Sequence, residues 1–175
     1  MTDQRLRTYS PNSVSVILTH DATGIVHTVT GFSEDSIVSI ERNAETFMMY
    51  RGADDTKTRI YNSDSSATIT VPLQQTSNSN DIFSLLYEYD RARLNSDGLF
   101  SLQIKDLTGR SVYFSDEAYI AIVPNSAFSN SMELREWVIH AASLNTTIAG
   151  NARFSADDAN SVTALGGNVA PQWEP

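Results

Sequence analysis

Hydrophobic and polar residues alternate along the first part of the chain with the period of a β-strand. Val14, Val16 and Leu18 point to one side of an extended segment 13–20, and the residues between them point to the other. The next four residues, Asp21–Gly24, are typical of a turn, and residues 25–30 again have the composition of a strand. The pattern therefore predicts a β-hairpin at the start of the fold.

A second hairpin is predicted over residues 45–61. Two strand-like segments flank the polar loop 52–55, and the whole unit is expected to be long. Its stem is apolar although its tip is charged, and the apolar stem residues are Phe47, Met48, Met49 and Ile60. A long hairpin with a polar tip adds nothing to the core of a monomer, so we expect it to protrude.

Further strands are predicted at 37–42, 67–73, 100–107, 110–114, 119–123 and 131–142. Pro72 lies inside one of them, and because proline has no N–H to donate, it is expected at a sheet edge or a strand end. The last segment fits a helix or a strand by its pattern alone. The consecutive apolar residues Trp137, Val138 and Ile139 favour a long strand that is covered on both faces.

One convincing helix is predicted, over residues 78–93. Asn78 is a plausible N-cap, and Asp81 follows in the first turn. An apolar stripe at helical spacing is expected to face the sheet, and its members are Ile82, Leu85, Leu86 and Tyr89. Many short strands with a single helix predict a mainly β fold, either a β-barrel or a β-sandwich with one packed α-helix.

The texture of the chain changes after Ser143. Residues 1–142 are predicted to form the β-barrel domain, whereas 143–175 are rich in small and polar residues with scattered apolar ones. We interpret this C-terminal extension as an arm that is weakly ordered alone.

The composition narrows the classes of partner. Twelve basic and 21 acidic residues give a formal net charge of −9, which argues against a protein that wraps nucleic acid. Ten of the basic residues are arginine, a bias that suits interfaces and that genome composition would explain equally well. No apolar run is long enough to span a membrane, and the polar segment Met1–Ser10 is not a signal peptide. We expect the protein in the cytoplasm of the cell that makes it, or in a particle assembled there.

The residues that could carry chemistry do not form a known pattern. Three dispersed histidines, His20, His27 and His140, are too few for a zinc site, and cysteine is absent. Neither a Gly-x-Ser-x-Gly elbow nor a phosphate-binding glycine loop is present. Paired acids occur at 34–35, 54–55, 116–117 and 157–158, and solvated surface acids are their simplest interpretation. We therefore predict no catalytic, cofactor-binding or metal-binding residues, and no enzyme.

Three stretches resemble the tail tube proteins of contractile-tailed bacteriophages. They are ATITVPLQQTSNSNDIFS (67–84), LQIKDLTG (102–109) and REWVI (135–139), and the resemblance covers roughly residues 9–142. It implies the tail-tube fold and a structural subunit of the virion. Six such subunits would form a ring, and stacked rings would enclose a lumen that conducts DNA. The implied partners are other copies of the chain, a tail sheath protein outside, a tape-measure protein and then DNA inside without specific binding, and a baseplate and tail terminator at the ends.

Within this resemblance, the 45–61 hairpin is the element predicted to reach the next ring. The candidate inter-ring contacts are its charged residues, Arg51, Asp54, Asp55, Lys57 and Arg59. The alternative hypothesis is a monomeric β-sandwich that binds carbohydrate or protein. It would need aromatic side chains gathered on one face, for which the candidates are Tyr50, Tyr61, Tyr113 and Tyr119.

Overall fold

The computed structural model describes residues 6–174, so residues 1–5 of the predicted domain, and Pro175, lie outside the described part. One sheet of eight strands has the order β2-β1-β7-β8-β9-β6-β3, with β10 paired to β8, and all pairs are antiparallel. Its strands are β1 (Val14–His20), β2 (Ile25–Thr28), β3 (Ser39–Arg42), β6 (Ala67–Gln74), β7 (Phe100–Asp106), β8 (Val112–Ile122), β9 (Leu134–Ala141) and β10 (Asn145–Thr147). The mainly β prediction is confirmed.

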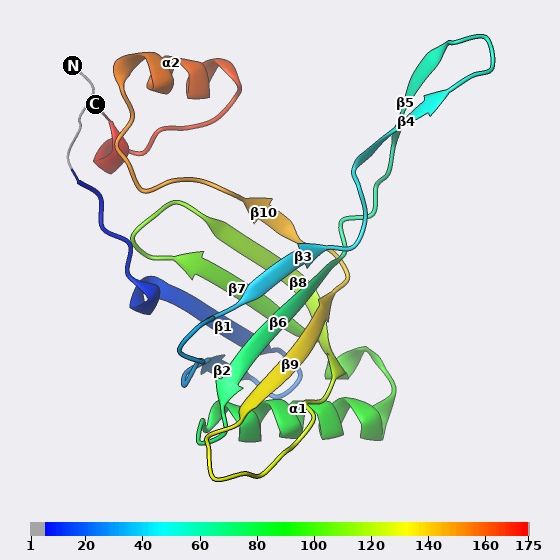
Figure 1. Ribbon diagram of the computed structural model, residues 1–175, viewed down its shortest axis with the longest axis vertical. Coiled ribbons are helices and arrows are strands. Elements are labelled where there is room, and N and C mark those ends of the chain that lie inside the picture. Colours follow the sequence, from blue (N-terminus) through cyan, green and yellow to red (C-terminus); the bar gives the residue numbers. More distant parts are fainter. Residues whose placement is uncertain (1–5, 175) are drawn as a thin grey trace.

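The remaining elements lie around this sheet (Figure 1). Two strands, β4 (Phe47–Arg51) and β5 (Lys57–Tyr61), form a separate two-stranded sheet that projects from the body. Helix α1 (Ser79–Arg93) lies at the opposite end of the molecule. The other elements are α2 (Ala156–Ala164) and the short 3₁₀ turns η1 (Pro11–Ser13), η2 (Ser96–Gly98) and η3 (Pro171–Trp173).

The chain between β2 and β3 joins the two ends of the sheet. Val29 N donates to Val16 O at 2.8 Å, which extends the pairing with β1. A few residues later, Gln74 N donates to Gly31 O at 2.8 Å, and Phe32 bridges Leu73 on β6. The same segment thus bonds to β1 and to β6. The sheet curls into a barrel-like layer around the core.

Pro72 lies near the end of β6, and its position explains why the strand tolerates it. Its carbonyl accepts from Ser33 N at 3.0 Å, so its nitrogen also points toward this side and away from β9. The ladder between β3 and β6 has ended by Thr70. Because Pro72 faces away from β9 and β3 no longer pairs at this point, the missing N–H of Pro72 breaks no hydrogen bond of the sheet.

Two predicted strands, 110–114 and 119–123, form one strand in the structure. β8 runs without interruption through Asp116 and Glu117, which lie between the two predicted segments. Irregularities in register at 100/102 and 120/122 let the strand bend while it stays paired on both sides.

The boundary predicted at residue 142 falls within the sheet. β9 pairs with β8 as far as Ala118↔Ala141, and β10 then continues along β8 from Phe114↔Asn145. Leu144, between these two strands, is buried in the core. The C-terminal extension therefore begins after Thr147. The composition changes at Ser143 because the short strand β10, which still belongs to the sheet, follows there.

The core lies between the inner face of the sheet and α1. Every second residue of β1, β6 and β9 is buried, and the buried residues include Val16, Leu18, Ile69, Val71, Trp137 and Ile139. The prediction that β9 is covered on both faces holds only in part, because Val138 is half-buried. Phe83 of α1 packs edge-on against Trp137, with ring centroids 5.4 Å apart. Trp137 Nε1 also donates to Asn80 Oδ1 at 2.9 Å, so apolar contact and a hydrogen bond hold the helix on β9.

The helix is where it was predicted, but its buried face is shifted relative to the predicted stripe, of which Leu86 is buried and Ile82 packs against the core. Leu85 is 67% exposed, whereas Leu86 is 5% exposed. The buried positions Ser79, Phe83 and Leu86 define the inner face, and Leu85 lies about 100° around the helix from Leu86. Ser79 faces inward because its Oγ accepts from Thr30 N at 3.0 Å and pairs with His27 Nε2 at 2.9 Å.

Asn78 precedes the first residue of α1, at the predicted N-cap position, but its side chain does not cap the helix. Its backbone angles are helical. Ser77 performs this role, because its Oγ accepts from Ser79 N at 3.1 Å and its carbonyl accepts from Asn80 N.

A second helix, α2, was not predicted. Ser155 caps it by accepting from Asp158 N at 3.2 Å, and Asp157 and Asp158 occupy its first turn. The signal, a serine followed three residues later by an acid, is present in the sequence. It was overlooked because the helix carries no apolar stripe, and none of its residues is buried.

Candidate assembly surfaces

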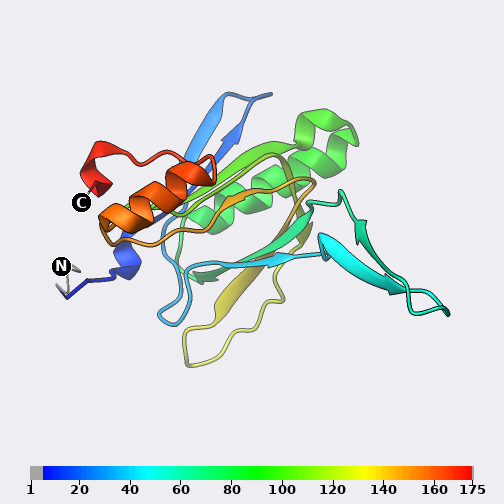
Figure 2. The ribbon, with the colours of Figure 1, turned by 90° about the horizontal axis from the view of Figure 1, so that it is seen from above.

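The β4–β5 hairpin stands clear of the body in two orthogonal views (Figures 1 and 2). All ten residues of its strands are exposed, although six of them are large and hydrophobic: Phe47, Met48, Met49, Tyr50, Ile60 and Tyr61. A hairpin of two strands is marginally stable alone in water. Exposed apolar residues on such an element are typical of an interaction surface.

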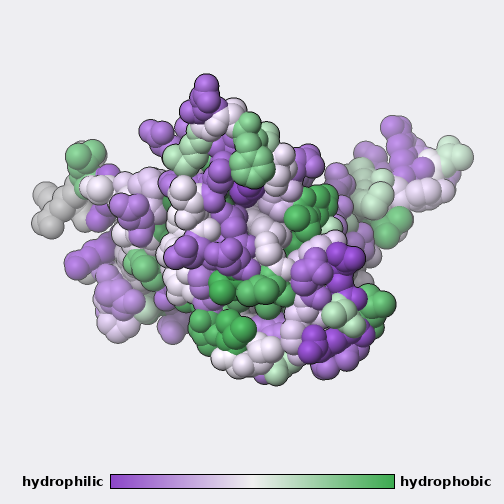
Figure 3. All heavy atoms as spheres, turned by 90° about the horizontal axis from the view of Figure 1, so that it is seen from below, coloured by the Kyte–Doolittle hydropathy of each residue, from purple (hydrophilic) through white to green (hydrophobic). Residues whose placement is uncertain are grey.

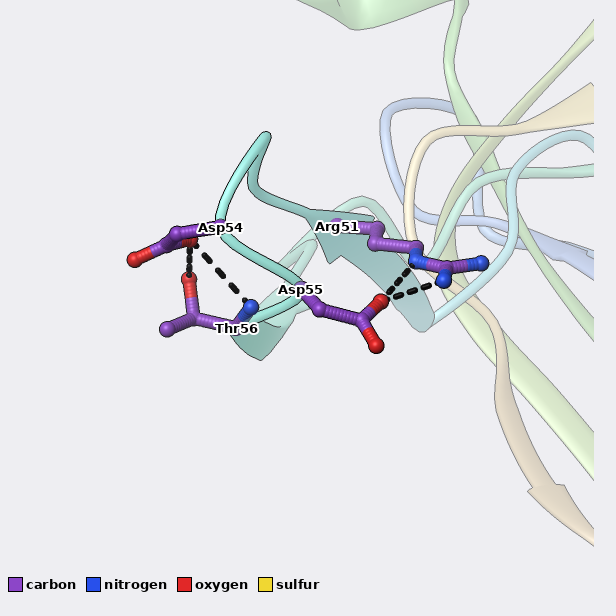
Figure 4. A network of polar contacts seen from close by, with 4 residues as sticks. All are labelled: Arg51, Asp54, Asp55 and Thr56. Atoms are coloured by element: carbon purple, nitrogen blue, oxygen red, sulfur yellow. Dashed lines mark hydrogen bonds and ion pairs between the residues drawn. The ribbon is translucent and has the colours of Figure 1, made fainter.

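The tip of the hairpin is organised by its own charged residues (Figure 4). Asp54 Oδ1 accepts from Thr56 Oγ1 at 2.7 Å and from Thr56 N at 3.2 Å. These hydrogen bonds lower the pKa of Asp54 below its ordinary value, and the bond to the Thr56 side chain has the larger effect. Arg51 pairs with Asp55, whose backbone φ is +68°. The turn is therefore shaped before any partner arrives.

Three of the five predicted contact residues are thus already engaged within the tip. Arg51 and Asp55 bind each other, and Asp54 binds Thr56. Lys57 and Arg59 differ, since neither has a carboxylate partner among the described residues. Arg59 lies instead over the ring of Phe47, 4.4 Å from its centroid. These two cations are the ones most available to a partner.

The register of the hairpin divides it into two unlike faces. Successive residues of a strand point to opposite sides, and directly paired residues share a side. One face is basic and aromatic, and it consists of Phe47, Met49, Arg51, Lys57, Arg59 and Tyr61. The other face is uncharged, and it consists of Met48, Tyr50, Thr58 and Ile60. Both faces would have to be covered for the hairpin to be buried.

A hollow of about 550 Å³ lies at the junction of β8 and β9. The end of β8, the start of β9 and the loop between them line this hollow. Its lining includes Ile122, Val123, Met132, Glu133, Leu134 and Glu136. Its hydrophobic members are substantially exposed, Met132 by 62% and Ile122 by 57%. Sequence reasoning missed this hollow because its walls come from segments that lie about ten residues apart and meet only through the register of β8 and β9.

The histidines do not form a site. His20 pairs with Ile25 and His27 with Leu18, so the two are not direct cross-strand neighbours. Burial lowers the pKa of His27, which contacts Ser79. Within residues 6–174, no three His, Asp or Glu side chains gather as metal ligands would. No helix in this described part is long and apolar enough to cross a membrane.

The four tyrosines of the binding-module hypothesis do not share a surface. Tyr50 and Tyr61 point to opposite faces of the hairpin. Tyr113 packs against the core, and Tyr119 contacts His140, with ring centroids 5.7 Å apart. No common aromatic platform for a carbohydrate exists among them.

The fold itself is shared with proteins of phage-like particles. A chain from the virion of a native gene transfer agent particle superposes with a TM-score of 0.54 and 12% identity, covering 81% of this chain and all of the other. A chain of the sheath–tube complex of the extracellular contractile injection system PVC, in its extended state, gives a TM-score of 0.52 at 13% identity over 83% of this chain and 93% of its own. The protein thus has the fold of tube subunits.

The chain belongs to the family of the bacteriophage PhiTE tail tube protein, because residues 6–149 match the sequence pattern of that family. It is also 52% identical over 169 residues to the structural protein ORF10 of Pseudomonas phage KPP10, an alignment that covers 97% of this chain and 98% of the relative. The predicted resemblance is confirmed, and the protein is a structural component of a phage tail tube. The family match ends two residues after β10, so α2 lies beyond it.

Proposed function

We propose that this chain is the repeating subunit of a tail tube in which six-membered rings stack around a DNA-conducting lumen, and that the β4–β5 hairpin carries the contacts between rings. One observation above all supports the role of the hairpin: all ten strand residues are exposed, and both faces carry large hydrophobic side chains outside the core of the subunit. Burial between subunits would remove this surface from water, a gain of about 25 cal/mol per Å² of apolar area.

The charge of the chain suits the proposed lumen. Each subunit has a formal net charge of −9, so a wall built from many copies repels phosphate and lets DNA slide. A relative in fold comes from a sheath–tube complex, and another from the tube-terminating cap of the anti-feeding prophage. By analogy, we propose a sheath protein outside, a tape-measure protein inside before DNA, and a baseplate and terminator at the ends. Assembly would take place in the host cytoplasm.

The hairpin can be removed without cutting into the core. Asn62 N donates to Thr46 O at 2.9 Å, so the two ends of the hairpin already lie side by side. Replacing residues 47–61 by Asn-Gly should leave the thermal stability of the subunit nearly unchanged but abolish tubes in negative-stain electron microscopy. Tubes of normal length from this variant would refute the role of the hairpin.

Point variants separate the apolar contact from the effect of a deletion. Met48→Ser with Ile60→Ser should shorten or abolish tubes, because it makes the uncharged face of the hairpin polar. The matched control is Leu94→Asn, which removes an exposed leucine at the C-terminal end of α1. It should assemble normally, since a left-handed backbone position tolerates asparagine.

We further propose that the arm, residues 148–174, binds a neighbouring subunit or the tube exterior. It contains few large apolar residues, and Ile148 and Leu165 are among those that remain exposed. Hydrogen exchange should show protection of this segment that increases on assembly. Equal exchange in free subunit and tube would mean that the arm has no role in the contact.

A further inference from the structure

We propose that the basic, aromatic face of the hairpin of one copy binds the hollow between β8 and β9 of the next copy. This inference rests on the proposed function, and it names the surface that receives the hairpin. The occupant is a second copy of this chain. The hollow and the hairpin are complementary in three respects: their position on the subunit, their charge and their apolar content.

The first argument is position, because the two surfaces lie at opposite ends of the subunit. β6 begins with Ala67 paired to Ala141, near the hairpin, and ends with Gln74 paired to Leu134, at the hollow. Seven residue steps of a strand span about 23 Å. The hairpin projects from the end of the sheet where β6 begins, and away from the hollow (Figure 1). A subunit cannot therefore fill its own hollow, whereas a copy stacked above it can.

The second argument is charge. The hollow presents Glu133 and Glu136, and Glu136 has no cationic partner among the described residues. The hairpin presents Lys57 and Arg59, which lack a carboxylate partner there. In a protein with a net charge of −9, a cationic face is uncommon, and an acidic hollow is the surface it would bind.

The third argument is the apolar content of both surfaces. Phe47 and Met49 share their face of the hairpin with the two cations. Ile122, Met132 and Leu134 share the hollow with the two acids. Each surface is thus a mixture of exposed hydrophobic groups and one sign of charge. A view of the end that carries α1 also shows hydrophobic patches among hydrophilic residues, with the hairpin reaching out to one side (Figure 3).

The contact has a geometric consequence. A surface at one end of a subunit that binds a different surface at the other end is heterologous, and repetition of it produces an open stack rather than a closed dimer. Each copy offers one hairpin and one hollow. Added copies therefore continue the stack, as a tube of indefinite length requires.

Cysteine cross-linking of the full chain tests the contact, because the natural sequence contains no cysteine. The double variant Met49→Cys with Leu134→Cys, assembled and then oxidised, should give a ladder of covalent multimers. A mixture of the two single variants should stop at covalent dimers. The control pair Met49→Cys with Leu94→Cys keeps an exposed cysteine but places it outside the hollow, and it should give no ladder.

Two results would overturn the proposal while the role of the hairpin in stacking stands. A covalent dimer from Met49→Cys alone would place two hairpins together. Tubes of the double variant that yield no ladder would place the hairpin on another surface. If tubes form without the hairpin, its proposed role between rings has failed, and the deletion of residues 47–61 tests that role separately.

Charge reversal provides a second test that needs no cysteine. Lys57→Glu with Arg59→Glu should abolish stacking, and so should Glu133→Lys with Glu136→Lys. All four changes together should restore tubes, because they exchange the two signs. Glu117→Lys is the matched control, since this exposed acid of β8 lies outside the hollow. Failure of the fourfold variant to recover stacking, with each half inactive, would contradict the proposed pairing.

Discussion

The guanidinium carbon of Arg110 lies 4.2 Å from the centroid of the Phe154 ring, which joins the turn between β7 and β8 to the C-terminal arm. The ring of Trp173 lies on the same group at 4.6 Å. Arg110 Nη1 also donates to Ala152 O at 2.7 Å, and Phe154 N donates to Trp173 O at 3.0 Å. The arm is therefore attached to its own subunit at both ends of α2.

Arg110→Ala should release the arm without unfolding the barrel. Each cation–π contact is worth about 0.5–2 kcal/mol, so the loss of two of them and a hydrogen bond opens a segment that buries little else. Hydrogen exchange of residues 152–173 should become faster, while the melting temperature of the barrel changes little. Arg91→Ala, which removes a similar contact with Tyr87 on α1, is the control and should leave the exchange of the arm unchanged.

Leu86→Ala and Leu85→Ala should differ strongly, although the residues are adjacent. Leu86 is buried against the sheet, so its truncation should lower the free energy of unfolding by about 2–5 kcal/mol. Leu85 is largely exposed, and its truncation should stay within about 0.5 kcal/mol. Urea unfolding of both variants checks this. A large loss for Leu85→Ala in the isolated subunit would contradict the assignment of the helix faces.

Much of the fold could be predicted because strands with one covered face reveal themselves by alternation. Val16 and Leu18 of β1 are buried at the predicted spacing, and the protruding hairpin follows from an apolar stem with a charged tip. The helix faces could not be predicted in the same way. Ser79 lies on the buried face, and only the fold shows that Thr30 and His27 satisfy its hydroxyl. A pattern of hydrophobic residues alone therefore includes Ile82 and Leu86, which do contact the core, but also Leu85, which does not.

The candidate contact surface was partly predictable. The hairpin residues are contiguous in the sequence, so their charges and apolar groups could be identified without a structure. Which of these charges remain available could not, since Arg51 and Asp55 meet only through the left-handed conformation of the turn. The hollow depends on the register of two strands, because Ile122 of β8 lies opposite Val138 of β9. No local pattern encodes that register.

The stability of the subunit should decrease as the pH falls through the titration range of histidine. Burial lowers the pKa of His27 from 6.5, so the folded state binds a proton less readily than the unfolded state. Its contribution is complete above the unfolded pKa and is lost as the pH falls toward the folded pKa. His27→Gln should reduce this slope in unfolding titrations between about pH 8 and pH 5. At the alkaline end, where His27 is neutral, the difference in unfolding free energy between the natural protein and His27→Gln measures the lost bond to Ser79. This difference serves as the control.

Gly31 closes the barrel next to the start of α1, and its replacement tests that closure. Its backbone has φ +74°, and an added Cβ would lie 2.6 Å from the Cβ of Ser77. Ser77 cannot move aside freely, because its Oγ donates to Thr30 O and accepts from Ser79 N. Gly31→Ala should therefore combine backbone strain with a clash that separates the 31–33 segment from the end of β6.

Gly24→Ala is the matched variant that isolates the strain. Gly24 has nearly the same backbone angle, φ +69°, but nothing within 4 Å of an added Cβ. Its replacement should cost only the penalty of a left-handed residue, about 1–2 kcal/mol. Gly31→Ala should cost about 1–3 kcal/mol more, which is the usual effect of overpacking. Urea unfolding of the two variants gives the difference directly. Equal losses would mean that the contact between Gly31 and Ser77 yields easily, and that closure of the barrel does not depend on the absence of a side chain at Gly31.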